Sequence, residues 1–395
     1  MNAINRKRKS KDIPMCKYGL SCYQKNLEHH KKYRHPEPIT ESKDLSNQDV
    51  VDDSFVFDGK SPPKTTRISD QNEIDDSVDD KGTPNTPLAE PKFKETVEKV
   101  LKSMPQDFFD FWEFCTSINK QKPEDAFADL GLHMIGIYDL LSQKLPRNKE
   151  IALHCHYRYY YDPPELQTVI RSNDKSLYHI GYFRDDPEDF PSVLVSNSAA
   201  VDCKLTLKGD NMFAAMNSEI TDRIKKLSPK LKKQFTKIQE DLQKLAKEKK
   251  YSLEISTTKT TARSKKVVSK TFNGFGIVVP VKNDIGYRPL PDSNAKVKSI
   301  LQKIVNCKDE EKRLNFEEDL DELITNVQFA NDECDFGMGL ELGIDLFYFG
   351  DPYFHSHILS ILPLAYNLLK RPKYAEIVQF HLANRKKSHN LNSLN

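Results

Sequence analysis

The feature that most limits how this chain can begin to fold is a set of two cysteines and two histidines near its start. Cys16, Cys22, His29 and His35 have the spacing C-x5-C-x6-H-x5-H, a complete ligand set for one structural Zn²⁺. So short a stretch cannot bury a core of its own, and its folding is expected to depend on the metal. DNA-reading fingers have about twelve residues between the second cysteine and the first histidine, where this chain has six. We therefore expect a zinc finger over residues 14–38 without sequence-specific DNA binding.

Composition limits the classes of protein to which the chain can belong. Its 395 residues, enough for two or three domains, carry 60 basic and 58 acidic side chains. The formal net charge is only +2, so no overall field favours a nucleic acid or a membrane. No apolar segment has the length of a membrane span, so neither secretion nor membrane insertion is expected. Five of the seven cysteines lie outside the zinc set, and this odd number favours reduced thiols in an intracellular protein.

Two segments that flank the finger are not expected to fold by themselves. Residues 1–13 form a basic tail with the run RKRK at 6–9, which is compatible with a nuclear localisation signal, a nucleic-acid patch or a solvated tail. Residues 39–91 are rich in Asp, Ser, Pro and Thr and poor in apolar residues. Burial therefore cannot offset the entropy of ordering them, and we expect a disordered acidic linker.

After the linker, the spacing of apolar residues alternates between the periods of helices and of strands. Helical spacing is found over 93–104, 108–114, 218–251 (divided at Pro229), 295–305, 310–329, 355–371 and 374–384. Strand alternation is found over 154–161 and 176–184, with a hairpin pattern within 251–281. Such interleaving predicts an α+β fold: a small finger and a linker, then a large mixed α/β globular region.

We divide this globular region into an N-terminal part over 92–217 and a C-terminal part over 218–385, followed by a tail over 386–395. The aromatic residues that crowd 108–114 would lie on one broad face of a helix. This arrangement favours a hydrophobic core over a ligand cage.

Several catalytic and ligand-binding motifs are missing or have the wrong spacing. The sequence contains no G-x-S-x-G elbow, no P-loop and no H-E-x-x-H pair. Gly337, Gly339 and Gly343 follow acidic residues that would repel a pyrophosphate, so we reject a dinucleotide loop there. His154 and His156 would share one strand face, but no nearby Cys or Asp completes a metal set. We interpret them as structural.

The segment most suited to take part in a reaction is an acidic run at the end of a predicted helix. Asp332, Glu333 and Asp335 fall within four residues, and like charges this close resist simultaneous ionisation unless they are solvated or paired. One carboxylate can thereby become a proton acceptor. Cys334 is not expected to be a nucleophile, because the flanking anions oppose thiolate formation. Arg288, in a predicted turn, is a candidate pairing cation. A solvated acidic turn without chemistry remains the alternative.

The zinc segment resembles the poly(ADP-ribose)-binding zinc finger, whose ligand spacing it matches throughout. The resemblance implies that Tyr18 and Tyr23 contact the polymer by stacking on adenine. The family usually has an arginine after the second tyrosine, where this chain has Gln24. A phosphate-pairing guanidinium is therefore absent, and weaker polymer binding is expected.

The rest of the chain, from about Phe93 to its end, resembles the histone PARylation factor family. The matching segments are YYDPPE at 160–165, GYFRD at 181–185, GYR at 286–288, FANDECD at 329–335 and LPLAYNLLKR at 362–371. They are long and are spread over some two hundred residues, so chance similarity is implausible.

The resemblance implies a protein that is no enzyme alone but binds the catalytic domain of a DNA-damage-activated poly(ADP-ribose) polymerase, which itself binds NAD⁺. Glu333 would deprotonate the acceptor serine of histones, Asp332 and Asp335 would lie beside it at the shared interface, and Tyr287 with Arg288 would contact partner or substrate. Docking there would also limit elongation of the poly(ADP-ribose) polymer. The expected location is the nucleus, on chromatin at DNA lesions. A poly(ADP-ribose) reader or scaffold and, less favoured, a stand-alone transferase or hydrolase are the alternatives.

Overall fold

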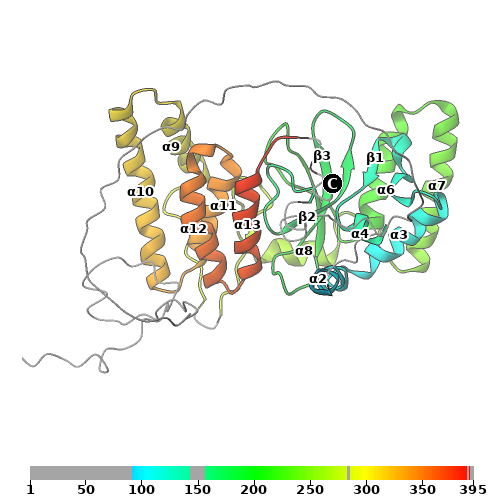
Figure 1. Cartoon of the computed structure of the whole chain (residues 1–395), viewed down its shortest axis with the longest axis horizontal. Coiled ribbons are helices and arrows are strands. Elements are labelled where there is room, and N and C mark those ends of the chain that lie inside the picture. Colours follow the sequence, from blue (N-terminus) through cyan, green and yellow to red (C-terminus); the bar gives the residue numbers. More distant parts are fainter. Residues whose placement is uncertain (1–90, 143–155, 283–284, 389–390, 392–395) are drawn as a thin grey trace, which may run out of the picture. The chain divides into compact units, whose positions relative to one another are not determined.

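The computed structural model describes residues 91–142, 156–282, 285–388 and 391 (Figure 1). The chain divides into two units, Met1–Pro87 and Leu88–Asn395, and every described residue belongs to the second. The predicted basic tail, zinc finger and nearly all of the linker lie outside the described residues. Within the described residues, no helix is both long and apolar enough to cross a bilayer.

The N-terminal part of this unit is built on a five-stranded antiparallel sheet. Its strands follow the chain in the order β1 (Leu132–Met134), β2 (Leu166–Ser172), β3 (Tyr178–Phe183), β4 (Val193–Ser198) and β5 (Thr206–Gly209). The central strands are buried along most of their length, as expected for β-branched and aromatic sequences between two covered faces. Gly181 on β3 lies close to β2, and a Cβ atom there would be 2.6 Å from the Gln167 carbonyl oxygen. Only glycine allows this approach.

Helices around the sheet complete the first core. They are α2 (Pro91–Lys102), α3 (Gln106–Ile118), α4 (Ile137–Leu141), α6 (Met212–Arg223) and α7 (Pro229–Glu248). The aromatic face of α3 is buried: Phe108 stacks on Tyr138 with ring centroids 4.2 Å apart, and Phe111 meets Phe213 edge to face at 5.7 Å. The prediction that the aromatic cluster is hydrophobic core is therefore confirmed.

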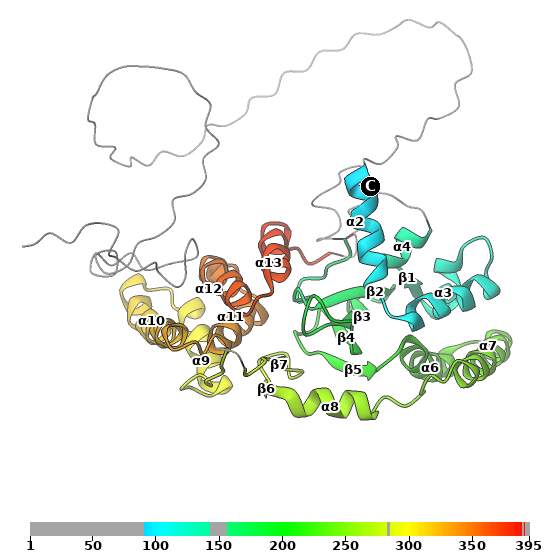
Figure 2. The ribbon, with the colours of Figure 1, turned by 90° about the horizontal axis from the view of Figure 1, so that it is seen from below.

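The C-terminal part is mostly helical and has its own core (Figure 2). After α8 (Thr258–Lys266) and the hairpin of β6 (Val267–Ser269) and β7 (Ile277–Val278) come α9 (Asn294–Asn306), α10 (Glu310–Asp332), α11 (Gly337–Phe349), α12 (His355–Leu368) and α13 (Pro372–Asn384). Helix α11 is buried over all but its last residue, as a helix that is apolar all round must be. Gly343 lets α12 approach, since a Cβ atom there would lie 3.0 Å from the Leu362 Cβ.

Side chains from the two parts meet around residues 160–165. The Tyr366 hydroxyl of α12 donates to both Glu165 carboxylate oxygens, at 2.9 and 3.0 Å. The Arg385 guanidinium, which follows α13, lies 4.0 Å from the ring centroid of Tyr160 and 4.1 Å from that of Phe347. These buried contacts join the sheet of the first part to the helices of the second.

One sequence prediction was wrong, and one long helix was missed. The strand predicted over 154–161 is absent where the structure describes it, because residues 156–161 form turns. The Asp162 carboxylate stabilises these turns by accepting from the Tyr159 backbone N–H at 3.0 Å and from the Thr168 hydroxyl at 2.7 Å. Helix α11 was not predicted at all. Its apolar residues show no 3.6-residue stripe, because it is buried on every side.

The strands β1, β2, β4 and β5 and the helices α4 and α8 were also not predicted, whereas several other elements were. The helices at both ends of the globular region, the strand at 176–184, the hairpin and the α+β class are confirmed. The three rejected glycines, Gly337, Gly339 and Gly343, lie inside α11 rather than in a phosphate-binding loop, so that rejection was correct. The divisions at 217 and 385 stay predictions, although α7 contributes Phe235 and Leu242 to the first core.

Candidate functional site

The acidic run lies at the turn that joins α10 to α11. Helix α10 ends in a Schellman motif, in which the Asp335 N–H donates to the Ala330 carbonyl at 2.8 Å and the Cys334 N–H donates to the Asn331 carbonyl at 3.2 Å. The motif requires a left-handed residue, and Cys334 has φ = +67°. The backbone thereby fixes the direction in which the neighbouring carboxylates of Glu333 and Asp335 leave the turn.

A second segment, from Ile285 to Arg288, lies alongside this turn. The Gly286 N–H donates to the Cys334 carbonyl at 2.8 Å, and the Gly337 N–H donates to the Gly286 carbonyl at 3.1 Å. A Cβ atom on Gly286 would be 2.3 Å from an Asp335 carboxylate oxygen, so no larger residue fits without displacing that carboxylate. The structure thus brings together the two segments that the sequence singled out.

Arg288 is the cation of this site, as predicted. Its Nε and Nη2 atoms donate to Asp335 Oδ2 at 3.1 and 2.8 Å, and Nη2 also donates to Glu333 Oε2. Asp335 is 26% exposed, Arg288 42% and Glu333 62%. The guanidinium is therefore anchored on the more buried carboxylate and shared with the more exposed one.

Tyr287 joins this segment to helix α11. Its hydroxyl donates to Glu341 Oε2 of α11 at 2.9 Å, and its ring lies so close to Gly337 that a Cβ atom there would be 2.8 Å away. Burial, together with the nearby Glu341 carboxylate, raises the pKa of the Tyr287 phenol. Its hydroxyl is thus committed to the protein interior, so any contact with a partner would come from its ring.

The exposed surface around Glu333 includes an aromatic residue that the list of predicted site residues omitted. Phe329 is 57% exposed and lies one helical turn before Asp332 and Glu333 on α10. Aromatic residues are enriched in protein–protein interfaces relative to the rest of the surface. The sequence signal was available, because Phe329 falls outside the buried stripe formed by Leu320, Leu323, Val327 and Ala330.

The geometry limits what the site can do alone. Glu333 and Asp332 are exposed at the turn, so both side chains are accessible to water. A carboxylate on an open surface can act as a base on a bound hydroxyl only after another molecule covers it. Among the described residues, no group of three or more His, Cys, Asp or Glu side chains could hold a metal.

Several predicted site residues cannot be placed. The zinc ligands Cys16, Cys22, His29 and His35, and the polymer-contacting residues Tyr18 and Tyr23, all lie outside the described residues. The same is true of His154. Its neighbour His156 lies in a turn, where its Nε2 is 2.9 Å from Asp139 Oδ2, in agreement with a structural role.

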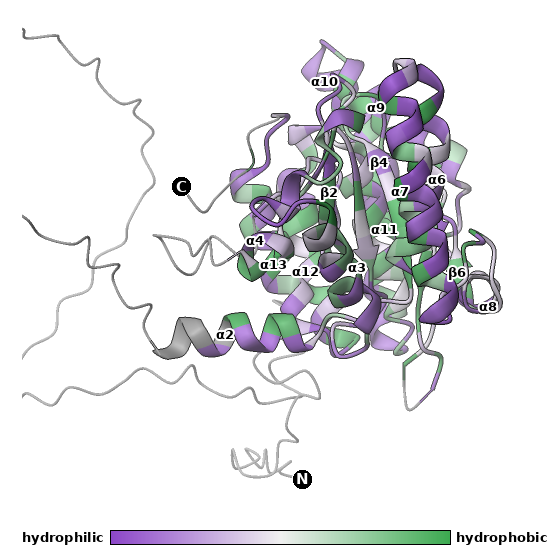
Figure 3. Cartoon of the chain, turned by 90° about the vertical axis from the view of Figure 1, so that its right-hand side faces the viewer, coloured by the Kyte–Doolittle hydropathy of each residue, from purple (hydrophilic) through white to green (hydrophobic). Residues whose placement is uncertain are grey.

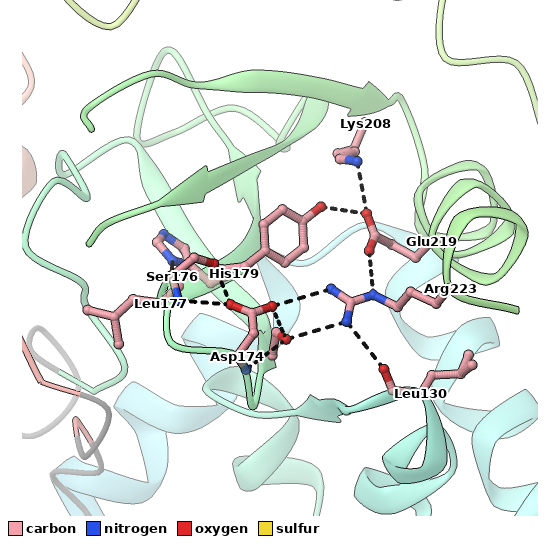
Figure 4. A network of polar contacts seen from close by, with 10 residues as sticks. Leu130, Asp174, Ser176, Leu177, His179, Lys208, Glu219 and Arg223 are labelled. Carbon is pink, nitrogen blue, oxygen red and sulfur yellow. Dashed lines mark hydrogen bonds and ion pairs between the residues drawn. The ribbon is translucent and has the colours of Figure 1, made fainter. Parts of the chain in front are cut away.

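A second charged cluster, which the sequence did not reveal, lies between the sheet and α6 (Figure 4). Glu219 accepts from Lys208 Nζ at 2.8 Å, from Arg223 Nε at 3.0 Å and from the Tyr178 hydroxyl. Burial alone would raise the pKa of Glu219, but Lys208 and these hydrogen bonds outweigh it and hold the pKa below its ordinary value. Glu219 is therefore a saturated anion that fixes α6 to the sheet.

Comparison with known proteins identifies the family of both regions. Residues 90–385 match the family model described as histone PARylation factor 1, and residues 14–38 match that of the PBZ domain. The chain is 47% identical to histone PARylation factor 1 of Mus musculus over 299 residues, and 45% identical to that of Bos taurus over 298. It is 43% identical over 300 residues to the putative histone PARylation factor 1-like protein of Homo sapiens. Each match covers 74% of this chain and 86% of the relative.

Proposed function

The chain belongs to the histone PARylation factor family, and from this premise we propose that it is an accessory factor that completes the active site of a poly(ADP-ribose) polymerase. In this proposal Glu333 is the general base for the modification of serine in histones and other proteins. The observation that carries it is the placement of Glu333. In the cluster formed by Arg288, Glu333 and Asp335, which we name the Arg288 cluster, Glu333 is the most exposed side chain. It lies on a turn whose backbone is fixed by hydrogen bonds. A base supplied to another protein must be both exposed and rigidly directed.

The chemistry explains why serine would need such help. A serine hydroxyl is a weak nucleophile, and a positioned base accelerates its attack on the anomeric carbon of NAD⁺ by about 10²–10⁴-fold. A carboxylate acceptor is already ionised at neutral pH and gains nothing from a base. Supplying Glu333 in trans therefore favours serine over Asp or Glu as the modified residue. Covering the acceptor side of the polymerase would also hinder elongation of the polymer.

The Arg288 cluster supplies a way for Glu333 to become available. Its carboxylate must come within about 2.6–3.2 Å of the serine hydroxyl, and in this proposal it exchanges its hydrogen bond with Arg288 Nη2 for that contact. Asp335 holds the same guanidinium through two hydrogen bonds. When the polymerase covers the turn, Glu333 leaves Arg288, and Asp335 continues to neutralise the cation.

For the finger, the PBZ match implies a zinc ion and poly(ADP-ribose) as the ligand. We assign the metal to Cys16, Cys22, His29 and His35 and the polymer contacts to Tyr18 and Tyr23. A finger that binds the polymer would keep the factor near active polymerase in the nucleus, on damaged chromatin. Because Gln24 stands in place of an arginine, this binding is expected to be modest.

The test of the catalytic proposal is reconstitution with polymerase, nicked DNA, NAD⁺ and a histone peptide, with the modified residues mapped. Glu333→Gln keeps the size of the side chain but removes the base, so serine modification should fall about 10²–10⁴-fold. Glu318→Gln, at an exposed position on the same helix, is the matched control and should leave the rate unchanged. Serine modification at the normal rate with Glu333→Gln would refute a catalytic role.

The PBZ match also favours one alternative, a reader or scaffold that binds poly(ADP-ribose) without contributing to catalysis. In that case both Glu333→Gln and Glu318→Gln would support serine modification, whereas Cys22→Ser would abolish polymer binding. Incubating the purified chain with NAD⁺ and peptide, without polymerase, separates both from a stand-alone transferase. Turnover in that mixture would exclude an accessory role.

A further inference from the structure

Charge is distributed unevenly along the described unit. Residues 225–250, which include α7, contain ten lysines and three acidic residues. Residues 309–335, which include α10, contain eleven acidic residues and only two basic ones. In both Figure 1 and Figure 2, α7 and α10 lie at opposite ends of this unit. The small net charge of the whole chain therefore conceals a strongly basic end and a strongly acidic end.

The basic face of α7 has a fixed orientation. Phe235, Leu242 and Ala246 are buried against the first core. The Gln239 side-chain amide donates to the Asn217 side-chain oxygen at 3.0 Å and to the Thr221 hydroxyl at 2.7 Å, which joins α7 to α6. The helix cannot rotate without breaking these contacts.

The face opposite this buried stripe carries an exposed row of lysines. Much of α7 is hydrophilic in colour in Figure 3. The exposed lysines recur at helical spacing: Lys230, Lys233, Lys237, Lys244 and Lys247. We name these five residues the lysine row. Because the opposite side of α7 is held in the core, the lysine row is presented rigidly to solvent.

Some surface lysines of the described residues are held in ion pairs, and the lysines of the row are not. Lys296 lies 2.8 Å from Asp292 and Lys373 lies 2.6 Å from Glu188. Within the described residues, no lysine of the row forms an ion pair, even though Glu240 and Asp241 belong to the same helix. The ammonium groups are therefore available to an external anion without breaking an internal contact.

We propose that the lysine row binds the phosphate backbone of duplex DNA. Helix α7 has 20 residues, a length of about 30 Å, which matches about one turn of B-form DNA. Duplex DNA carries one negative charge per about 1.7 Å of axis, so several lysines along such a helix can each displace a counterion. The contact reads no sequence, because lysines that bind phosphates carry no base information.

The absence of aromatic residues from the lysine row favours duplex DNA over single strands and poly(ADP-ribose). Binding of unpaired bases, including adenine, uses aromatic side chains as stacking platforms. The only aromatic residue within 225–250 is Phe235, which is buried. Tyr251, directly after this segment, donates its hydroxyl to Asp110. The lysine row offers positive charge alone, which suits a continuous array of phosphates.

This binding would not compete with the site at Glu333, which lies at the other end of the unit. It would add a weak contact to whatever affinity the factor has for DNA-bound polymerase, and linked weak contacts multiply in strength. The inference does not depend on the catalytic role of Glu333 and holds equally for a scaffold.

The test uses the full-length protein and a fluorescent duplex of about 20 base pairs, with affinity measured from about 50 to 200 mM salt. In the variant Lys233→Gln, Lys237→Gln, Lys244→Gln, affinity at the lowest salt should fall at least about tenfold. The slope of log K against log salt should decrease by about 2.7, since each lost phosphate contact removes about 0.9. The matched control is Lys120→Gln, Lys175→Gln, Lys298→Gln, which changes net charge equally at three scattered exposed positions.

Equal affinity and slope in the two triple variants would overturn the proposal, because the basic tail and net charge would then account for binding. Loss of poly(ADP-ribose) binding in the lysine-row variant, with duplex binding unchanged, would also overturn it. Because every substituted lysine is exposed, the variant should retain the wild-type melting temperature. A selective loss of duplex binding in a folded variant, with poly(ADP-ribose) binding unchanged, is the result that the proposal predicts.

Discussion

Two charged clusters of this protein contain similar residues but differ in burial. Glu219 has two cations and a tyrosine hydroxyl around it, and its side chain is 6% exposed. Glu333 shares one guanidinium with Asp335 and is 62% exposed. The first carboxylate is buried and held by three donors, whereas the second can exchange its partner at little cost, because exposed ion pairs contribute only about 0–1 kcal/mol. The burial and three donors of Glu219 indicate a structural role, whereas the exposure of Glu333 and its shared partner are consistent with the functional role that we propose for it.

The largest effect that would test this contrast is the loss of stability on removing Glu219. Glu219→Ala leaves Lys208 and Arg223 next to each other and largely buried without their anion, so the free energy of unfolding should fall by about 3 kcal/mol or more. Thermal or urea unfolding measures this change. Glu240→Ala, at an exposed position of α7, should change stability by less than about 0.5 kcal/mol. A similarly small effect for Glu219→Ala would mean that the saturated cluster is not structural.

A pH series sharpens the comparison, because Glu165 and Asp345 are buried without a strong cationic partner. Burial raises the pKa of Glu165 to about 7 and that of Asp345 to about 8. The folded state then binds more protons than the unfolded state above about pH 4–5, so stability should fall as pH rises to about 8. Each such proton lowers the free energy of unfolding by at most about 1.4 kcal/mol per pH unit.

Glu165→Gln should remove one of these protons while keeping an acceptor for the Tyr366 hydroxyl. Urea unfolding at pH 6 and at pH 8 should show a smaller loss of stability in the variant than in the wild type. The same pH dependence in both proteins would show that Glu165 is ionised in the folded state.

The smallest predicted effect concerns how Arg288 is shared. Asp335→Asn weakens the anchor of the guanidinium, so Arg288 should compete more strongly for Glu333 and serine modification should fall about tenfold, or about 1.4 kcal/mol in barrier. Mapped modification assays measure this change, with Asp319→Asn on the exposed face of α10 as the control. An unchanged rate in Asp335→Asn would show that Glu333 does not depend on Asp335 to be released.

The sequence predicted those parts of the fold that carry a periodic signal. The amphipathic helices and the aromatic core around Phe108 and Phe111 were recognisable because one face of each element is buried. Helix α11 was missed because burial on all sides leaves no stripe. The strand predicted over 154–161 was wrong because Asp162 stabilises turns there, an interaction that alternation of apolar residues does not reveal.

The residues of the candidate site were also predictable only where the sequence itself carries a signal. Asp332, Glu333 and Asp335 lie within four residues, and a nearby cation was expected for them, so the pairing of Glu333 and Asp335 with Arg288 was predictable. The cluster of Glu219 was not, because its members come from three elements and meet only through the tertiary fold. Sequence adjacency revealed the surface site, whereas the buried cluster required the structure.

The most direct measurement is a structure of this protein bound to the catalytic domain of the polymerase, with an NAD⁺ analogue and a serine peptide. We predict that Glu333 has left Arg288, that Arg288 remains on Asp335, and that a Glu333 carboxylate oxygen lies within about 2.6–3.2 Å of the serine hydroxyl. A complex in which Glu333 still pairs with Arg288 and faces bulk solvent, away from the bound dinucleotide, would contradict a catalytic role for this residue.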